Sequence, residues 1–273
     1  MTKVALLKGK RDSDTVEKTI GLAGGLRDLT GKPVLIKVNF ISTKTWETGT
    51  TTDPVVVEGI IKALKPLNKN IAVVESDATM TNCEKAARIT GMRALCEKYQ
   101  IPFVNLRKVK DRVSLQVPNP ETLSRINLPK MVLESHIISA AKLKTHTETT
   151  VTLGLKNMFG LMPDKLKAKY HMRNISKVIV DLNKIVKSSF TVIDGFIGME
   201  GKGPVYGKPV KMDLVIAGKD PVATDAVAAK VMGFEYDNIH HIRRLSELGV
   251  GKTTDIEIVG DRLQDIKRDF AHP

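Results

Sequence analysis

Short apolar runs recur along the chain and alternate with segments of helical periodicity. The runs have the length of strands and lie at residues 4–8, 34–40, 71–76, 136–143, 190–194, 213–218 and 256–260. Several are continuously apolar, which is typical of strands covered on both faces. Helical patterns lie between them, at residues 54–66, 82–99, 150–160, 173–188, 221–232 and 238–248. A strand followed by a helix, repeated along the chain, predicts an α/β fold with a mostly parallel sheet and helices on both faces.

Two segments depart from this alternation. Residues 104–130 contain a short alternating run, VSLQV, and three prolines, which predicts a short β excursion, either a hairpin-like excursion or an element at the edge of the sheet. Residues 195–212 are rich in glycine and form a candidate flap or small lobe. No linker or repeat divides the sequence, so we expect residues 1–273 to form a single α/β domain.

Composition limits the class of protein. With 273 residues, of which 42% are hydrophobic, the chain can bury a substantial core. It has no apolar run of the roughly 18 residues that crossing a bilayer requires, and its first residues do not resemble a signal peptide, so we expect a cytoplasmic protein with no membrane partner. The two cysteines, Cys83 and Cys96, are too few for an iron-sulfur cluster held by this chain alone. We interpret them as buried free thiols.

Polar side chains follow four of the predicted strands at their carboxyl ends. They are Lys37 and Asn39, then Glu75, Ser76 and Asp77, then Lys142, Lys144 and His146, and finally Asp194. Ligands of open parallel sheets bind beyond the carboxyl ends of the strands, where helix N-termini also point. The sequence therefore predicts one common site at this edge of the sheet.

The segment AKLKTHTETTVTLGLKNMFG, residues 141–160, is suited to an anion. Lys142 and Lys144 are two residues apart on a predicted strand, so they point to the same face. Thr149, Thr152 and Lys156 follow at helical spacings, and Lys156 leans back towards the start of its helix, where backbone N–H groups favour negative charge. Crowded lysines lower one another's pKa values, which would make one of them a base or an imine-forming amine.

The leading hypothesis is an enzyme that binds a small anionic substrate or cofactor, a carboxylate or a phosphate. The candidate anion-binding residues are Lys37, Asn39, Lys142, Lys144, Thr149, Thr152 and Asn157. The catalytic candidates are His146, Lys156 and Asp194, with His146 moving protons. Asp77, His171 and Glu200 are candidate ligands of a divalent metal, although no spacing in the sequence demands one. His240 and His241 lie at the start of a predicted helix, and we expect surface or capping roles for them.

Two further hypotheses remain open. The formal net charge of +13 and the basic clusters RKVKDR (107–112) and KLKAKYHMR (165–173) are compatible with nucleic-acid binding. Aromatic residues make up only 4% of the chain, which leaves few platforms for base stacking. The third hypothesis is a non-catalytic ligand-binding protein that works with an iron-sulfur redox partner.

Six motifs in a fixed order resemble a known family. They are VLIKVNF, TTDP, VVESDA, KTHTETTVTLGLKNMFG, VIDGFIGMEGKGP and AGKDPVATDAVAAKVMGF. Together they resemble the family called "domain of unknown function 362" over residues 34–250. Many members carry an added ferredoxin-like cysteine cluster, which this sequence lacks. The resemblance implies the fold and the position of the motif, but no established activity.

A fainter similarity is to the N-terminal domain of the lactate racemase family, which binds a nickel-pincer nucleotide cofactor. His146 precedes Lys156 by ten residues and His171 follows Lys156 by fifteen, close to the spacings of that family. The similarity implies Lys156 as the cofactor lysine, His146 as the base and His171 as a metal ligand. Ser76 and Asp77 stand where that family has a further strand-end histidine.

Overall fold

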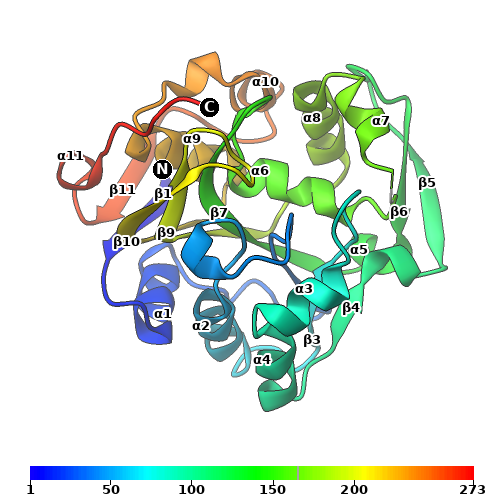
Figure 1. Cartoon of the computed structure of the whole chain (residues 1–273), viewed down its shortest axis with the longest axis horizontal. Coiled ribbons are helices and arrows are strands. Elements are labelled where there is room, and N and C mark those ends of the chain that lie inside the picture. The colour runs from blue at the N-terminus through cyan, green and yellow to red at the C-terminus, as the bar shows by residue number, and fades with distance from the viewer. Residues whose placement is uncertain (165) are drawn as a thin grey trace.

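A large mixed sheet forms the centre of the molecule (Figure 1), and the α/β class predicted from the sequence is confirmed. The structure is a computed structural model that describes residues 1–164 and 166–273. The strands of this sheet are β1 (Thr2–Lys8), β2 (Val34–Lys37), β3 (Ile71–Glu75), β4 (Phe103–Asn105), β7 (His136–His146), β8 (Thr150–Val151), β9 (Phe190–Glu200), β10 (Lys208–Gly218) and β11 (Ile256–Gly260).

The strand order is β11-β1-β10-β9-β7-β2-β3-β4, with β8 paired to the end of β7. Neighbours from β9 through β7, β2 and β3 to β4 are parallel, and so are β1 and β11. Strand β10 runs antiparallel to both β1 and β9. The sheet is therefore mostly parallel, and β9, β7, β2 and β3 bring their carboxyl ends to one edge.

Helices cover both faces of the sheet, as the sequence predicted. One face carries α1 (Ser13–Leu22), α2 (Pro54–Leu64), α3 (Cys83–Ile89) and α4 (Met92–Tyr99). The other carries α6 (Leu153–Asn157), α8 (Ile175–Ile185), α9 (Pro221–Val231) and α10 (His240–Glu247). The short elements are α5 (Lys130–Leu133), α7 (Ala168–His171), α11 (Leu263–Ile266) and the 3-10 turns η1 (Trp46–Thr48), η2 (Leu106–Lys108), η3 (Met158–Leu161) and η4 (Tyr236–Asn238).

Strand β2 illustrates how the two cores form. Val34 and Ile36 pack into the core beneath α1 and α2, whereas Leu35 packs into the core beneath α8 and α9. Side chains alternate between the faces of a strand, so Lys37 lies on the same face as Leu35. It is only 1% exposed at the carboxyl end of β2.

The segment around 104–130 forms the predicted β excursion. Its strands β5 (Arg112–Gln116) and β6 (Arg125–Pro129) pair antiparallel in a separate two-stranded sheet. The glycine-rich segment 198–209 comprises the end of β9, the connection 201–207 and the start of β10, and these two strands form a long antiparallel pair. Pro204, Val205 and Tyr206 of the connection line the cavity described below.

Several boundaries differ from the sequence prediction. The single helix expected at 82–99 is two helices, because Gly91 adopts a left-handed φ of 82° between them. The helix expected at 150–160 contains only the five residues of α6 before it tightens into η3. Helix α1 was not predicted. Asp53 and Asp220 cap the starts of α2 and α9: the carboxylate of Asp53 accepts from the backbone N–H of Val55, and that of Asp220 from those of Val222 and Ala223.

Candidate functional site

A cavity of about 510 Å³ lies at the carboxyl ends of β2, β3 and β7. Its walls come from the loops that follow β2 and β3, the last residues of β7, helix α6 with η3, and the β9–β10 connection. A volume of this size suits a small molecule. Of the residues proposed from the sequence, the cavity brings together Lys37, Asn39, Ser76, Lys144, His146, Thr152, Lys156, Asn157 and His171.

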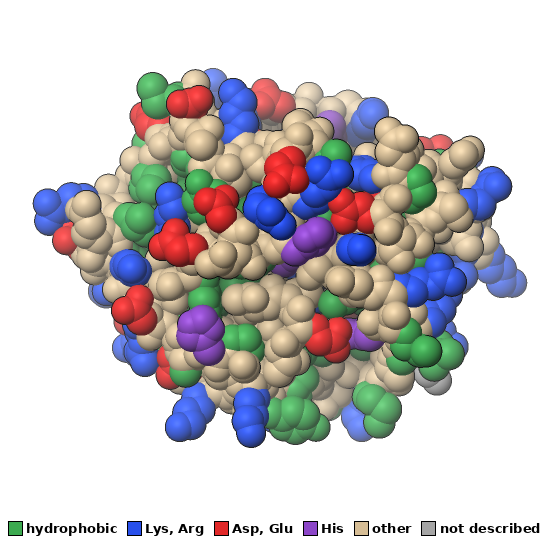
Figure 2. Space-filling view, turned by 90° about the horizontal axis from the view of Figure 1, so that it is seen from above, with side chains coloured by type: hydrophobic (Ala, Val, Ile, Leu, Met, Phe, Trp, Pro, Cys, Tyr) green, Lys and Arg blue, Asp and Glu red, His purple; other side chains and the backbone are tan. Residues whose placement is uncertain are grey.

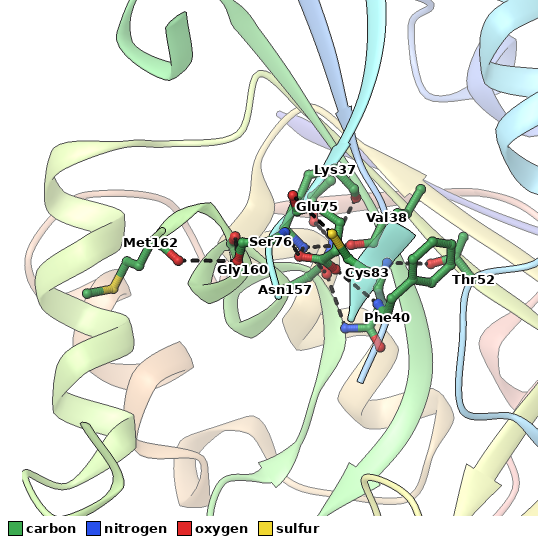
Figure 3. Close-up of polar contacts among 12 residues, drawn as sticks. Lys37, Val38, Phe40, Thr52, Glu75, Ser76, Cys83, Asn157, Gly160 and Met162 are labelled. Atoms are coloured by element: carbon green, nitrogen blue, oxygen red, sulfur yellow. Dashed lines mark hydrogen bonds and ion pairs between the residues drawn. The ribbon is translucent and has the colours of Figure 1, made fainter. Parts of the chain in front are cut away.

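A buried ion pair forms the floor of the site (Figure 3). Lys37 Nζ lies 2.8 Å from Glu75 Oε1 and also donates to the carbonyl oxygen of Val38 at 2.6 Å. Glu75 in turn accepts from the backbone N–H groups of Phe40 and Ser76. Because the carboxylate and the ammonium neutralise each other, Lys37 is a structural part of the site more than a free cation. Burial lowers the pKa of Lys37, and Glu75 opposes this effect.

Asn157 connects this floor to the rest of the cavity. Its Nδ2 donates to the carbonyl oxygen of Lys37 at 2.9 Å and to Ser139 Oγ at 3.1 Å. These contacts fix the orientation of the amide, so its Oδ1 accepts from Asn39 Nδ2 at 3.1 Å. This hydrogen bond also orients the side-chain amide of Asn39, so that its Oδ1 is available as an acceptor. Asn39 Oδ1 is buried and has no partner among the described residues.

Three of the four lysines that line the cavity are held by hydrogen bonds. Lys37 is held by Glu75 as described, Lys144 Nζ donates to the carbonyl oxygen of Thr50 at 2.7 Å, and Lys167 Nζ donates to Ser76 Oγ at 2.7 Å. Burial lowers the pKa of Lys167 to about 8. Burial, together with the charges of Lys156 and Lys142, lowers the pKa of Lys144 well below its ordinary value.

Lys156 differs from these three. It is half-buried on α6, and its ammonium has no hydrogen-bond or ion-pair partner within residues 1–164 and 166–273. Burial lowers the pKa of Lys156 to about 8; Glu148 opposes this effect, and Lys167 and Lys37 add to it. Lys156 thus faces the cavity as a lysine without a hydrogen-bond partner among the described residues.

His146 is held as a neutral ring. Its Nδ1 accepts from the backbone N–H of Glu148 at 3.1 Å. Burial, followed by the charges of Lys156 and Lys144, lowers its pKa far below the ordinary histidine value. The neutral ring with an accepting Nδ1 carries its proton on Nε2. In this state His146 is a hydrogen-bond donor towards the cavity rather than a ready proton acceptor.

The start of helix α6 already has an anion of its own. The carboxylate of Asp225, from α9, accepts from the backbone N–H groups of Gly154 and Leu155, both at 2.8 Å. The N–H groups expected to hold an external anion are therefore occupied by the protein. Lys156 alone, and not the helix terminus, presents positive charge to the cavity from this element. Burial also raises the pKa of Asp225 to about 7.

Five of the proposed residues lie outside the cavity lining. Lys142 and Asp194 form a fully buried ion pair with a separation of 2.8 Å. Asp77 binds Arg107 and Asn105. Thr149 donates to the carbonyl oxygen of Val151, and Glu200 lies 3.6 Å from Arg268. The structure does not bring these five side chains to the same place.

The three candidate metal ligands are separated. Asp77 is engaged by Arg107, Glu200 by Arg268, and His171 Nδ1 lies 2.7 Å from Glu148 Oε2. Among the residues that the structure describes, no three His, Cys, Asp or Glu side chains are grouped as a metal ion would need. Cys83 and Cys96 are both buried free thiols, as the sequence predicted.

Some residues near the site had not been proposed from the sequence. Glu148 and Lys167 line the cavity, Asp225 orients α6, and His241 is fully buried. The expected surface or capping role of His241 is wrong, because α10 turns this side chain inward against α8 and α9. After burial, the charge of Lys156 has the largest effect on the pKa of His241, which it lowers. Lys167 belongs to the basic cluster KLKAKYHMR, whose composition gave no sign that one of its lysines is buried.

Charged side chains of both signs are interspersed on the face shown in Figure 2, with histidines among them. Three side chains of the basic clusters proposed to bind nucleic acid form ion pairs within the chain. Arg107 pairs with Asp77, Lys108 with Glu84, and Lys169 with Asp164. At the site, Lys144, Lys156 and Lys167 form no ion pair with any described residue.

Fold and site together define an α/β protein with a lysine-lined cavity at the carboxyl edge of a mostly parallel sheet. Residues 34–230 match the family described as "Domain of unknown function (DUF362)", and the chain belongs to this family. It is also similar to the thylakoid-associated protein sll1697 of Synechocystis sp. (strain ATCC 27184 / PCC 6803 / Kazusa). The two are 25% identical over 230 residues, which are 82% of this chain and 70% of that protein.

These comparisons confirm the family predicted from the motifs. Neither match is to the lactate racemase family, so that similarity stays a prediction. Over the described parts of the chain, no helix has both the length and the apolar character that crossing a membrane requires.

Proposed function

We propose that the cavity binds a small molecule with a carboxylate or phosphate group and that the protein is an enzyme acting on it. The observation that carries this proposal is the charge of the lining, in which four lysines stand against two glutamates. Glu75 is already paired with Lys37, and Glu148 contacts His171. Among the described residues Lys144, Lys156 and Lys167 form no ion pair, so the lining has an excess of basic groups that an anionic ligand would balance.

The remaining polar groups of the cavity give the ligand an orientation. Lys144 and Lys167 contribute N–H donors in fixed positions, because hydrogen bonds to the protein hold each of them in place. Thr152 Oγ1 and Asn39 Oδ1 are buried without partners among the described residues, and buried polar groups of native proteins are normally hydrogen-bonded. The neutral His146 donates from Nε2 to an oxygen of the ligand or to charge that develops on it.

Calorimetry tests the proposal, with oxalate and inorganic phosphate as probes. We expect one of them to bind at low millimolar concentration or tighter. Lys156→Met should raise the Kd about tenfold or more, since a hydrogen bond to a charged group contributes about 1.5–3 kcal/mol. Lys202→Met is the matched control, because Lys202 is exposed on the β9–β10 connection and should leave the Kd unchanged. Failure of both probes to bind, or equal binding by Lys156→Met, would contradict the proposal.

The catalytic part of the proposal has its own test. If the protein is an enzyme, His146→Ala should abolish turnover of the substrate while the ligand affinity falls only slightly. A non-catalytic partner of an iron-sulfur redox system would tolerate the same replacement. Native mass spectrometry and metal analysis of protein from its own host would reveal a retained cofactor, which the same lysines would hold through an anionic group.

Nucleic-acid binding is the alternative function, and it would account for the net charge of +13. A filter-binding assay repeated across salt concentrations separates the two functions. Steeply salt-dependent binding would support the alternative, and no binding at low salt would remove it.

A cytoplasmic location belongs to the same proposal. The name of the Synechocystis relative associates that protein with thylakoids, so fractionation of host cells should include the membrane pellet. Recovery of the protein in that pellet would contradict the proposed location.

A further inference from the structure

We propose that Lys156 forms an imine with the carbonyl carbon of a small 2-oxo acid, or of an aldehyde that carries an acid group, held in this cavity. The inference rests on the proposed function, which supplies the acid group of the ligand. It adds the chemical class of the substrate and the atom of the protein that reacts.

The hydrogen bonds of the site single out Lys156 from the other lysines. Lys37, Lys144 and Lys167 each donate to an oxygen of the protein. Those nitrogens would have to break a buried hydrogen bond before reacting. Lys156 has no such partner within the described chain, and it lines the same cavity.

The charge state of Lys156 agrees with this role. Burial lowers its pKa to about 8. At pH 7 roughly a tenth of such amines are neutral, against fewer than about one in a thousand for an ordinary lysine. Only the neutral amine has the lone pair that attacks a carbonyl carbon.

The neighbours of Lys156 fit the two ends of such a molecule. Lys144 and Lys167 are held in place by hydrogen bonds at other points of the lining, where their N–H groups suit the acid group. His146 lies close enough to Lys156 for the lysine to be the main charge that lowers its pKa. Its Nε2–H is the donor available to the carbonyl oxygen. Thr152 precedes Lys156 by four residues on α6, and its buried hydroxyl lacks a partner among the described residues.

The reaction balances without any additional reagent. Nζ of Lys156 attacks the carbonyl carbon, and a proton passes from the nitrogen to the oxygen to give a carbinolamine. The hydroxyl then leaves with a second proton from the nitrogen as water, and a C=N bond forms. Nothing is oxidised or reduced, and one water molecule is released.

Trapping with a hydride donor tests the inference on the full-length protein. Glyoxylate is the probe, and sodium cyanoborohydride reduces any imine to an N-carboxymethyl amine. Peptide mapping by mass spectrometry then locates the modified lysines. At pH 7 and low glyoxylate we expect Lys156 to be modified at least about tenfold faster than the exposed Lys202, because of its larger neutral fraction.

Lys156→Arg separates this inference from the proposed function. Arginine keeps the positive charge but does not form this imine, so the variant should still bind oxalate and should lose the fast adduct. Oxalate, which cannot be trapped, should slow the modification of Lys156 in the native protein. It should leave the modification of Lys202 unchanged.

Two results would contradict the proposal that Lys156 forms an imine. If oxalate binds but Lys156 is modified no faster than Lys202, the inference falls and the proposed anion site stands. If oxalate and phosphate both fail to bind and Lys156 is not modified preferentially, both fall together.

Discussion

Lys142 Nζ lies 2.8 Å from Asp194 Oδ2, and both side chains are fully buried. The two residues are register partners on the parallel neighbours β7 and β9. Asp194 also accepts from the backbone N–H of Asp53 at 2.8 Å, so it fastens the start of α2 to the sheet. Neither residue of this ion pair lines the cavity, whereas Lys144, two residues further along β7, does.

Removing one partner of this pair should destabilise the protein strongly. In Lys142→Met the carboxylate of Asp194 stays buried without its cation, which costs about 3–5 kcal/mol of the free energy of unfolding. Urea denaturation measures the change. Lys211→Met removes the exposed partner of Asp213 and should cost less than about 1 kcal/mol. A loss of that small size for Lys142→Met would show that the pair is not structural.

His241 should make stability depend on pH. Its ring is fully buried, and burial, followed by the charge of Lys156, lowers its pKa to about 3. Between about pH 3 and pH 6.5 the unfolded chain binds a proton at this position and the folded chain does not. Stability is therefore fully present above about pH 6.5 and is lost as the pH falls, by about 1.4 kcal/mol per pH unit for one proton.

The variant His241→Phe isolates this effect. Its free energy of unfolding, measured in urea at several pH values, should fall less steeply on acidification than that of the native protein. The difference between the two slopes should be close to one proton between about pH 4 and pH 6. Parallel curves would mean that His241 is protonated in the folded state.

Thr152→Val should separate stability from binding. Thr152 Oγ1 is buried and has no partner in the described chain, so replacing the hydroxyl by a methyl group should leave the free energy of unfolding unchanged or raise it by up to about 1 kcal/mol. If the ligand provides the missing hydrogen bond, its Kd should rise about tenfold. Urea denaturation and calorimetry measure the two quantities. Lower stability with unchanged affinity would contradict a ligand contact at this hydroxyl.

Gly160 should not tolerate a side chain. A Cβ at this position would collide with Lys37 Nζ and with Glu75 Oε1, the two ends of the buried ion pair. Gly160→Ala should therefore lower the free energy of unfolding by about 1–3 kcal/mol and weaken the binding of oxalate or phosphate. Gly21→Ala is the control, because Gly21 lies in α1 with open space around it and alanine favours a helix. An unaffected Gly160→Ala would show that the floor of the site is adaptable.

Apolar periodicity predicted much of the fold. The continuous runs at 34–40 and 71–76 correspond to the buried parallel strands β2 and β3, and the Asp-Pro pairs mark the starts of α2 and α9. These features are local, because burial on both faces and helix capping each depend on residues close together in the chain. The family could also be recognised from the motifs alone.

The sequence also indicated the edge of the sheet at which the cavity lies. Parallel strands bring their carboxyl ends together, so Lys37, Ser76 and His146 could be expected to converge, and all three line the cavity. The spacing of Lys142 and Lys144 was equally correct in predicting a shared face. The spacing did not predict which residues Lys142 and Lys144 contact.

Only the tertiary structure decided which polar groups are consumed by the protein and which are left for a ligand. Lys142 pairs with Asp194 because β9 is the neighbour of β7, and α6 receives the carboxylate of Asp225 from a helix about seventy residues later in the chain. Lys167 and His241 are buried by elements that pack over them, although the sequence around each is polar. An ion pair or a buried hydrogen bond depends on separations of a few ångströms between distant residues, and one-dimensional spacing does not determine those separations. The sequence by itself thus determined the architecture and the edge of the sheet, while tertiary packing gave Lys37, Lys144 and Lys167 hydrogen-bond partners and left Lys156 without one among the described residues.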